Sequence, residues 1–113
     1  MDTNTTLPFE IDVRSVQRML ANNEITLIDC REEVEHRRAA IEGAVLIPMS
    51  QWMNRLSDLQ SLPNQRIVVH CHHGGRSARV TQWLRENGYP MSQNMTGGID
   101  AWSDEIDPAV PKY

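Results

Sequence analysis

The stretch from His70 to Ser77, His-Cys-His-His-Gly-Gly-Arg-Ser, carries residue types that suit a reactive thiol. The β-branched run at 67–69 predicts a buried strand before it, and the amphipathic pattern at 77–87 predicts a helix after it. Glycines allow a tight loop, and a curled loop points successive backbone N–H groups at its centre. The N-terminal end of the helix adds a positive potential there. Such surroundings lower a cysteine pKa from about 8.5 into the ~3.5–7.5 range, so we expect Cys71 to be a nucleophilic thiolate.

Alternating strand and helix patterns must position this loop. The predicted strands cover 9–11, 25–28, 44–47, 67–69 and 91–95, and the predicted helices follow Asp12, cover 32–40, follow a Ser50 cap, cover 77–87 and follow Gly98. Strands separated by helices predict an α/β fold with a five-stranded parallel sheet flanked by helices on both faces. Ligand sites in such sheets lie beyond the C-terminal ends of the strands, which selects Cys71 and, after the second strand, Asp29-Cys30-Arg31.

Length and composition limit the remaining possibilities. The 113 residues contain no repeat or linker, so we expect one domain over 1–113, with a core at about 9–103 and an irregular tail at 104–113. The chain is 40% hydrophobic and 23% charged, which argues against disorder. The net charge of −4 disfavours nucleic-acid binding through phosphate contacts. No apolar run approaches the ~20 residues of a membrane helix, and no signal peptide is visible. Two cysteines are too few for a disulfide framework, so we expect a reducing cytoplasm. The sequence carries no clear signal of an oligomer, and we take a monomer as the default.

Four motifs in order resemble those of the rhodanese-like sulfurtransferases. The loop at 71–77 is similar to the active-site loop of that family. Leu27-Ile28-Asp29-Cys30-Arg31-Glu32, followed by Glu35, resembles its L-I-D-V-R-E segment. Ile41 to Pro48 resembles its I-x-G-A-x-x-I-P segment, and Gly97 to Trp102 resembles its G-G-x-x-A-W segment. The resemblance covers roughly residues 9 to 103 and implies the same parallel-sheet fold.

The resemblance also implies a reaction that uses no cofactor. Cys71 would attack the outer sulfur of a small anionic donor such as thiosulfate, and the extra sulfur would rest on it as a persulfide. A thiophilic acceptor (cyanide, a thiol or a protein) would then remove that sulfur in a second step. Arg76 would close the ring and attract the donor. The backbone N–H groups expected to hold the sulfur belong to His72, His73, Gly74, Gly75, Arg76 and Ser77.

Two other functions are compatible with the loop. Cysteine phosphatases and arsenate reductases use a related loop, but with five residues between the Cys and the Arg. Here there are four, which leaves less room for a tetrahedral phosphoryl group. The other alternative is a binding or regulatory module of the same fold with little turnover. An intact cysteine in an intact loop argues against that alternative.

Several nearby residues have structural interpretations. Asp29 and Arg31 are expected to pair and brace the strand end. Cys30 is expected to pack like the valine that it replaces, with a resolving thiol as the alternative. We expect no metal, because adjacent histidines rarely point at one centre and separated ligand pairs are absent. The chain departs from the family pattern at Ala39-Ala40, where Gly-His is common, and at Ile99, where an aromatic residue is common.

Overall fold

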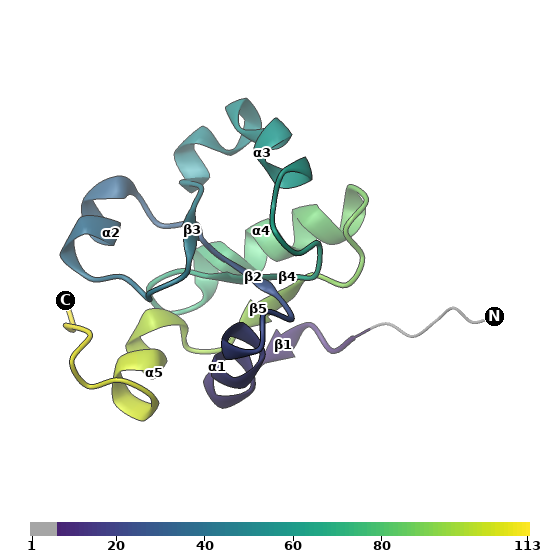
Figure 1. Ribbon diagram of the computed structural model, residues 1–113. Helices are drawn as coiled ribbons and strands as arrows, with labels where there is room; N and C mark the ends of the chain where they lie inside the picture. The colour runs from purple at the N-terminus through teal and green to yellow at the C-terminus, as the bar shows by residue number, and fades with distance from the viewer. Residues whose placement is uncertain (1–6) are drawn as a thin grey trace.

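Five parallel strands form one sheet in the order β1-β5-β4-β2-β3 in the computed structural model, which describes residues 7–113 (Figure 1). The strands are β1 (Glu10–Ile11), β2 (Thr26–Asp29), β3 (Val45–Leu46), β4 (Ile67–His70) and β5 (Gln93–Met95). The helices are α1 (Val13–Ala21), α2 (Glu33–Arg38), the 3-10 helix η1 (Met49–Asn54), α3 (Leu56–Gln60), α4 (Gly75–Glu86) and α5 (Gly98–Glu105). This arrangement confirms the predicted fold class.

Residues 1–6, on which the expectation of no signal peptide rests, lie outside the described residues. Within residues 7–113, every helix is too short or too polar to cross a bilayer.

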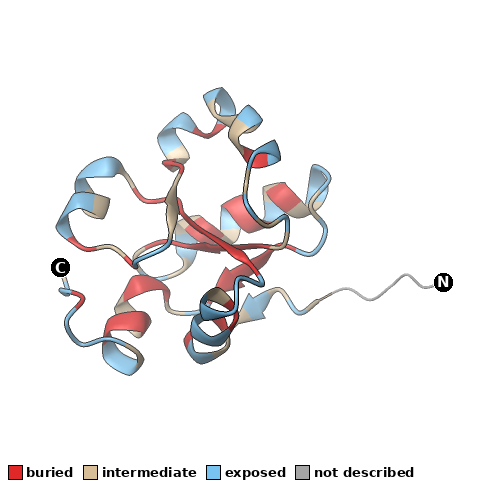
Figure 2. Ribbon diagram, in the orientation of Figure 1, coloured by how far each residue is buried: buried red, intermediate tan, exposed pale blue. Residues whose placement is uncertain are grey.

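The central strands alternate their side chains between two helical layers. Leu27 and Val68 point to one face, where they pack in a buried cluster with residues of α1 and α5. Ile28 and Val69 point to the other face, where they pack with residues of η1, α3 and α4. Figure 2 shows the buried residues concentrated on the central strands, between helices with exposed outer surfaces. Because β4 lies in the middle of the sheet, the loop that follows it receives neighbours from both sides.

Of the two predicted helix N-caps, Asp12 and Ser50, the first is confirmed and the second is wrong. The Asp12 carboxylate accepts a hydrogen bond from the Ser15 backbone N–H at 3.2 Å, so Asp12 caps α1 as predicted. Ser50 caps no helix. Its hydroxyl donates to the Glu32 carboxylate at 2.5 Å, and Pro48 precedes the helical turn instead. The expected single helix after residue 50 is two short pieces, η1 and α3.

The other boundaries differ by a few residues. Helix α4 begins at Gly75, two residues before the predicted start, and Met91 lies outside β5 and is 43% exposed. The segment 104–113 begins inside α5, which ends at Glu105. Beyond it the chain has no regular secondary structure but folds back, with Val110 buried and its carbonyl accepting from Ser103 Oγ at 2.6 Å.

Candidate active site

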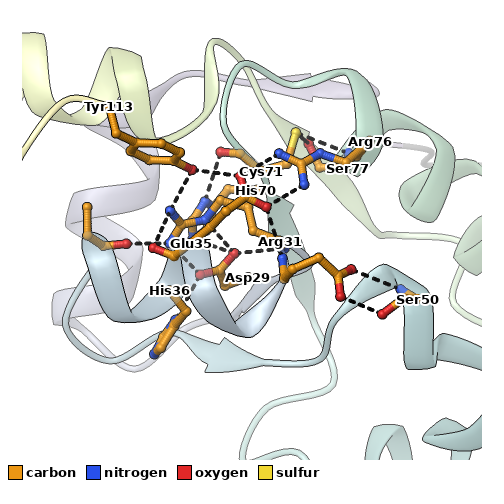
Figure 3. A network of polar contacts seen from close by, with 12 residues as sticks. Asp29, Arg31, Glu35, His36, Ser50, His70, Cys71, Arg76, Ser77 and Tyr113 are labelled. Carbon is orange, nitrogen blue, oxygen red and sulfur yellow. Dashed lines mark hydrogen bonds and ion pairs between the residues drawn. The ribbon is translucent and has the colours of Figure 1, made fainter.

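Cys71 lies directly beyond the C-terminal end of β4 with its sulfur facing backbone N–H groups. The Gly74 N–H donates to Cys71 Sγ at 3.1 Å, and the Ser77 N–H contacts it at 3.4 Å (Figure 3 shows Cys71 beside Ser77). The side chain is 1% exposed, so the sulfur is shielded from bulk water. Two of the six N–H groups that were expected to hold the sulfur therefore contact the Cys71 sulfur itself.

One of the two loop glycines is required by the backbone. Gly74 has φ +113°, a conformation that other residues resist, and it immediately precedes α4. Gly75 is the first residue of α4, and its φ is not positive. A Cβ added at Gly75 would meet no atom within 4 Å. The sharp turn thus depends on Gly74 and not on the glycine pair that the sequence suggested.

A second glycine pair holds the loop from the opposite side. At the start of α5, the Ile99 N–H donates to the Cys71 carbonyl at 2.9 Å, and the Asp100 N–H donates to the His72 carbonyl at 3.2 Å. Gly98 has φ +61°, and a Cβ there would collide with both of these carbonyl oxygens. The Gly97-Gly98 motif therefore lets α5 approach the nucleophile loop closely. Ile99 is 1% exposed in the core, so the missing aromatic there does not alter an exposed rim.

Cys30 is the neighbour of Cys71 on the adjoining strand. Asp29 and His70 are partners in the β2–β4 register, and Cys30 and Cys71 are the next residues along the two strands. The Cys30 N–H donates to the His70 carbonyl at 3.1 Å. Both cysteines are reduced, buried and members of the same core cluster. The interaction with the neighbouring Cys30 side chain is the largest cause that lowers the pKa of Cys71. The backbone N–H groups of the loop lower it further, against the effect of burial, while the pKa of Cys30 is raised. Cys71 is thus the thiolate of the pair.

The Ser77 hydroxyl is committed to another partner. Asn94 donates through Nδ2 to Glu10 Oε2 at 3.0 Å and to the Gly74 carbonyl at 3.3 Å, which turns its Oδ1 toward Ser77. Ser77 Oγ lies 2.5 Å from Asn94 Oδ1 and 3.3 Å from Cys71 Sγ. Since the hydroxyl has one proton, it donates to Asn94. Ser77 therefore serves the sulfur through its backbone N–H, and Asn94, which the sequence did not single out, fixes the loop.

Asp29 and Arg31 form the predicted brace beneath the loop. Arg31 Nε donates to Asp29 Oδ1 at 2.9 Å and its NH2 group donates to Asp29 Oδ2 at 2.6 Å, with both side chains fully buried. Burial alone would raise the pKa of Asp29, but the Arg31 hydrogen bonds and the charge of His70 hold it at about 2. Arg31 also donates to the Ala39 carbonyl at 2.6 Å, which ties this pair to the Ala39-Ala40 segment.

Arg76 pairs with a residue from another element. Its NH1 and NH2 groups donate to the two carboxylate oxygens of Glu35, on α2, at 2.7 and 2.9 Å (Figure 3). The Arg76 hydrogen bonds, against a smaller effect of burial, hold the pKa of Glu35 at about 2. Arg76 thus joins α4 to α2 through an ion pair, and its charge is balanced by Glu35; its expected role in closing the ring and attracting the donor stays a prediction.

Tyr113 brings the C-terminal segment to the site, which no sequence pattern indicated. Its hydroxyl accepts from Arg31 NH1 at 2.8 Å and donates to Glu35 Oε2 at 3.0 Å. Its ring stacks on His72 with centroids 4.0 Å apart, and His72 stacks on His73 at 3.9 Å. The loop therefore has an aromatic neighbour that comes from the tail.

The two loop histidines come close to Asp100. The ligand atoms of the three residues lie within 4.8 Å of one another, closer than the argument from adjacent positions suggested. The imidazole planes are only 21° apart, so their in-plane lone pairs run side by side and do not converge on one ion. Asp100 is 3.4 Å from Lys112 Nζ. We therefore expect both histidines to act as rim residues. Burial lowers the pKa of His72, which favours its neutral form.

Comparisons with known proteins agree with this geometry. The family model described as "Rhodanese-like domain" matches residues 12–105. "Rhodanese-like/PpiC domain-containing protein 12, chloroplastic" of Arabidopsis thaliana is 38% identical over 93 residues, covering 80% of this chain and 31% of that protein. A protein named "Sulfurtransferase" in Allochromatium vinosum is 34% identical, covering 89% of this chain and 94% of the relative.

The solved structures show the same fold. The human single-domain sulfurtransferase TSTD1 superposes with a TM-score of 0.77 at 24% identity, covering 88% of this chain and 98% of that one. The chain spans only about a third or less of the first curated relatives that it matches. A family match over 12–105, together with the sheet order and the Cys71 loop, shows that the chain belongs to the rhodanese-like domain family.

Proposed function

We propose that this protein is a sulfurtransferase that carries sulfane sulfur as a persulfide on Cys71. The observation that carries the proposal is the contact of Cys71 Sγ with the N–H groups of Gly74 and Ser77 at the start of α4. Within the described residues, four more N–H groups of the loop have no hydrogen-bond acceptor; they belong to His72, His73, Gly75 and Arg76. An anionic outer sulfur would find donors there that the resting thiolate does not use.

The first half-reaction follows from this arrangement. The Cys71 thiolate attacks the outer sulfur of thiosulfate, an S–S bond forms to Cys71, and sulfite leaves with the electron pair of the broken bond. The persulfide keeps one negative charge, which the helix N-terminus and the free N–H groups stabilise. In the second half-reaction a thiophile such as cyanide or a thiol takes the outer sulfur and returns the thiolate.

The donor meets a site whose side-chain charges are largely balanced. The Arg76 cation is paired with Glu35, and the lowered pKa of His72 favours its neutral form. The attraction for an anion then comes mainly from the oriented backbone N–H groups, which suits a small donor that enters the loop. Thiosulfate fits this requirement. The physiological acceptor in the proposal is a thiol or a protein, met by a monomer in a reducing cytoplasm.

Intact mass spectrometry tests the proposal directly. The reduced protein is mixed with thiosulfate, with Cys71→Ser and Cys30→Ser measured beside it. We expect the wild-type protein, quenched immediately after mixing, and Cys30→Ser to gain one sulfur atom that cyanide removes, and Cys71→Ser to gain none. Folded, reduced protein that gains no sulfur from thiosulfate or from a persulfide donor would contradict the proposal. Hydrolysis of an aryl phosphate that is lost in Cys71→Ser would then indicate the phosphatase alternative, and the lack of both activities would indicate a binding module.

A further inference from the structure

The two cysteines of the chain form a pair that the proposed reaction does not yet use. Cys30 and Cys71 occupy the position directly beyond the Asp29–His70 partners of neighbouring parallel strands. Neighbouring strands lie about 4.7–4.9 Å apart, within the ~4.4–6.8 Å Cα separation that a disulfide spans. Both side chains belong to the same core cluster, so both point to the same face of the sheet. The two side chains are therefore neighbours on one face of the sheet, with a strand spacing that is compatible with a disulfide.

We propose that Cys30 is a resolving thiol that discharges the Cys71 persulfide as sulfide when no acceptor takes the sulfur. This inference rests on the proposed function. The Cys30 sulfur attacks Cys71 Sγ, an S–S bond forms between the two cysteines, and the bond from Cys71 Sγ to the outer sulfur breaks. The outer sulfur leaves with that electron pair and takes the Cys30 proton, so the product is HS⁻. The two cysteines end as a disulfide, and an external thiol or dithiol reduces it to restart the cycle.

The protonation states of Cys30 and Cys71 keep the attack on the donor separate from the later attack on the persulfide. In the resting protein Cys71 is the thiolate and Cys30 keeps its proton, because the pKa of Cys71 is lowered and that of Cys30 is raised. Only Cys71 therefore attacks the donor. Once the persulfide forms, the negative charge moves to the outer sulfur, and Cys30 is left beside a neutral Sγ that is open to attack.

The surroundings of the outer sulfur favour its departure. The N–H groups of Gly74 and Ser77 reach Cys71 from α4, whereas Cys30 reaches it from β2. The free loop N–H groups that hold the outer sulfur also stabilise the leaving HS⁻. Because Cys30 and Cys71 are neighbours in one core cluster of the same chain, this attack is intramolecular, with the high effective concentration of a prepositioned group.

A single-turnover experiment tests the inference. Reduced wild-type protein, Cys30→Val and Cys30→Ser are loaded with thiosulfate without oxygen, freed of donor, and followed by intact mass and by assay of released sulfide. We expect the wild-type protein to lose its added sulfur, release one sulfide per chain and become two hydrogen atoms lighter than the reduced form. Non-reducing peptide mapping should join Cys30 to Cys71, and dithiothreitol should reverse the link. In both variants the persulfide should last at least about tenfold longer.

The outcomes separate this inference from the proposed function. A wild-type persulfide that lasts as long as that of Cys30→Ser, with Cys30 still a free thiol, would overturn the resolving role and leave sulfur transfer intact. Wild-type and variant proteins that never gain sulfur would overturn the proposed function, and the resolving role with it. Two variants guard against a folding defect, since valine preserves the apolar packing and serine preserves the size and a hydrogen-bond donor. Reduced protein incubated without donor controls for oxidation by residual oxygen.

Discussion

Replacement of Gly98 by alanine should displace the Cys71 loop although it changes no residue of that loop. The Cβ of the new residue would lie 2.5 Å from the Cys71 carbonyl oxygen, whereas ordinary contacts begin at 3.4 Å. Relief of this collision moves the loop and α5 apart by about 0.9 Å, and it weakens the hydrogen bonds of the Ile99 and Asp100 N–H groups to the loop. A displacement near 1 Å can cost about 100-fold in rate. We therefore expect Gly98→Ala to lower kcat/KM for sulfur transfer by about 10- to 100-fold.

Gly88→Ala is the matched control, because it separates backbone strain from collision. Gly88 also has a positive φ, +100°, but a Cβ there would meet no atom within 4 Å. Both variants should lose about 1–2 kcal/mol of unfolding free energy from the unfavourable φ. Only Gly98→Ala should lose activity beyond that, and its stability should fall further.

Urea unfolding and initial rates with thiosulfate and cyanide measure both effects. Rates are compared at a temperature where each variant is fully folded. If Gly98→Ala keeps kcat/KM within about twofold of Gly88→Ala, α5 does not position the loop, and our reading of the second glycine pair is refuted.

Three further predictions follow from the polar contacts. Cys30→Val removes the neighbouring thiol that lowers the pKa of Cys71, so the apparent pKa for alkylation of Cys71 by iodoacetamide should rise by about one to two pH units; an unchanged profile would contradict this effect of Cys30. Glu35→Gln leaves the Arg76 cation without its partner, so KM for thiosulfate should fall at low ionic strength and the difference should vanish in high salt; a KM equal to that of the wild type would count against a balanced charge. The pKa of Asp29 is about 2, below the ordinary 3.8, so its pairing contributes about 2 kcal/mol above pH 4 that is lost as pH falls toward 2; urea unfolding from pH 2 to 6 should show a slope that is reduced in Asp29→Asn.

Features carried by neighbouring residues could be predicted from the sequence. The β-branched run before Cys71 and the turn at Gly74 are local, and they place the nucleophile at the end of β4. The pairing of Asp29 with Arg31 joins residues only two apart, and it was predictable for the same reason.

Contacts between distant segments could not be predicted in this way. Glu35 meets Arg76 across 41 residues and Tyr113 across 78, and nothing in the spacing of those residues favours one partner over another. Ser50 was expected to cap a helix because serine commonly does so, but Glu32, 18 residues earlier, accepts its hydroxyl proton. The neighbouring position of Cys30 depended on the β2–β4 register, which a sequence pattern does not determine.

Some of the residues that hold the Cys71 loop in place follow Cys71 by more than 25 positions in the sequence, which has a consequence for biosynthesis. A ribosome delivers the nucleophile well before Gly98 and Tyr113, which complete its surroundings. Until those residues dock, the Cys71 and His72 carbonyls lack the N–H groups of Ile99 and Asp100 that hold the loop in place. The nucleophile site is therefore complete only after α5 and Tyr113 have docked, and they are among the last parts of the chain to be made.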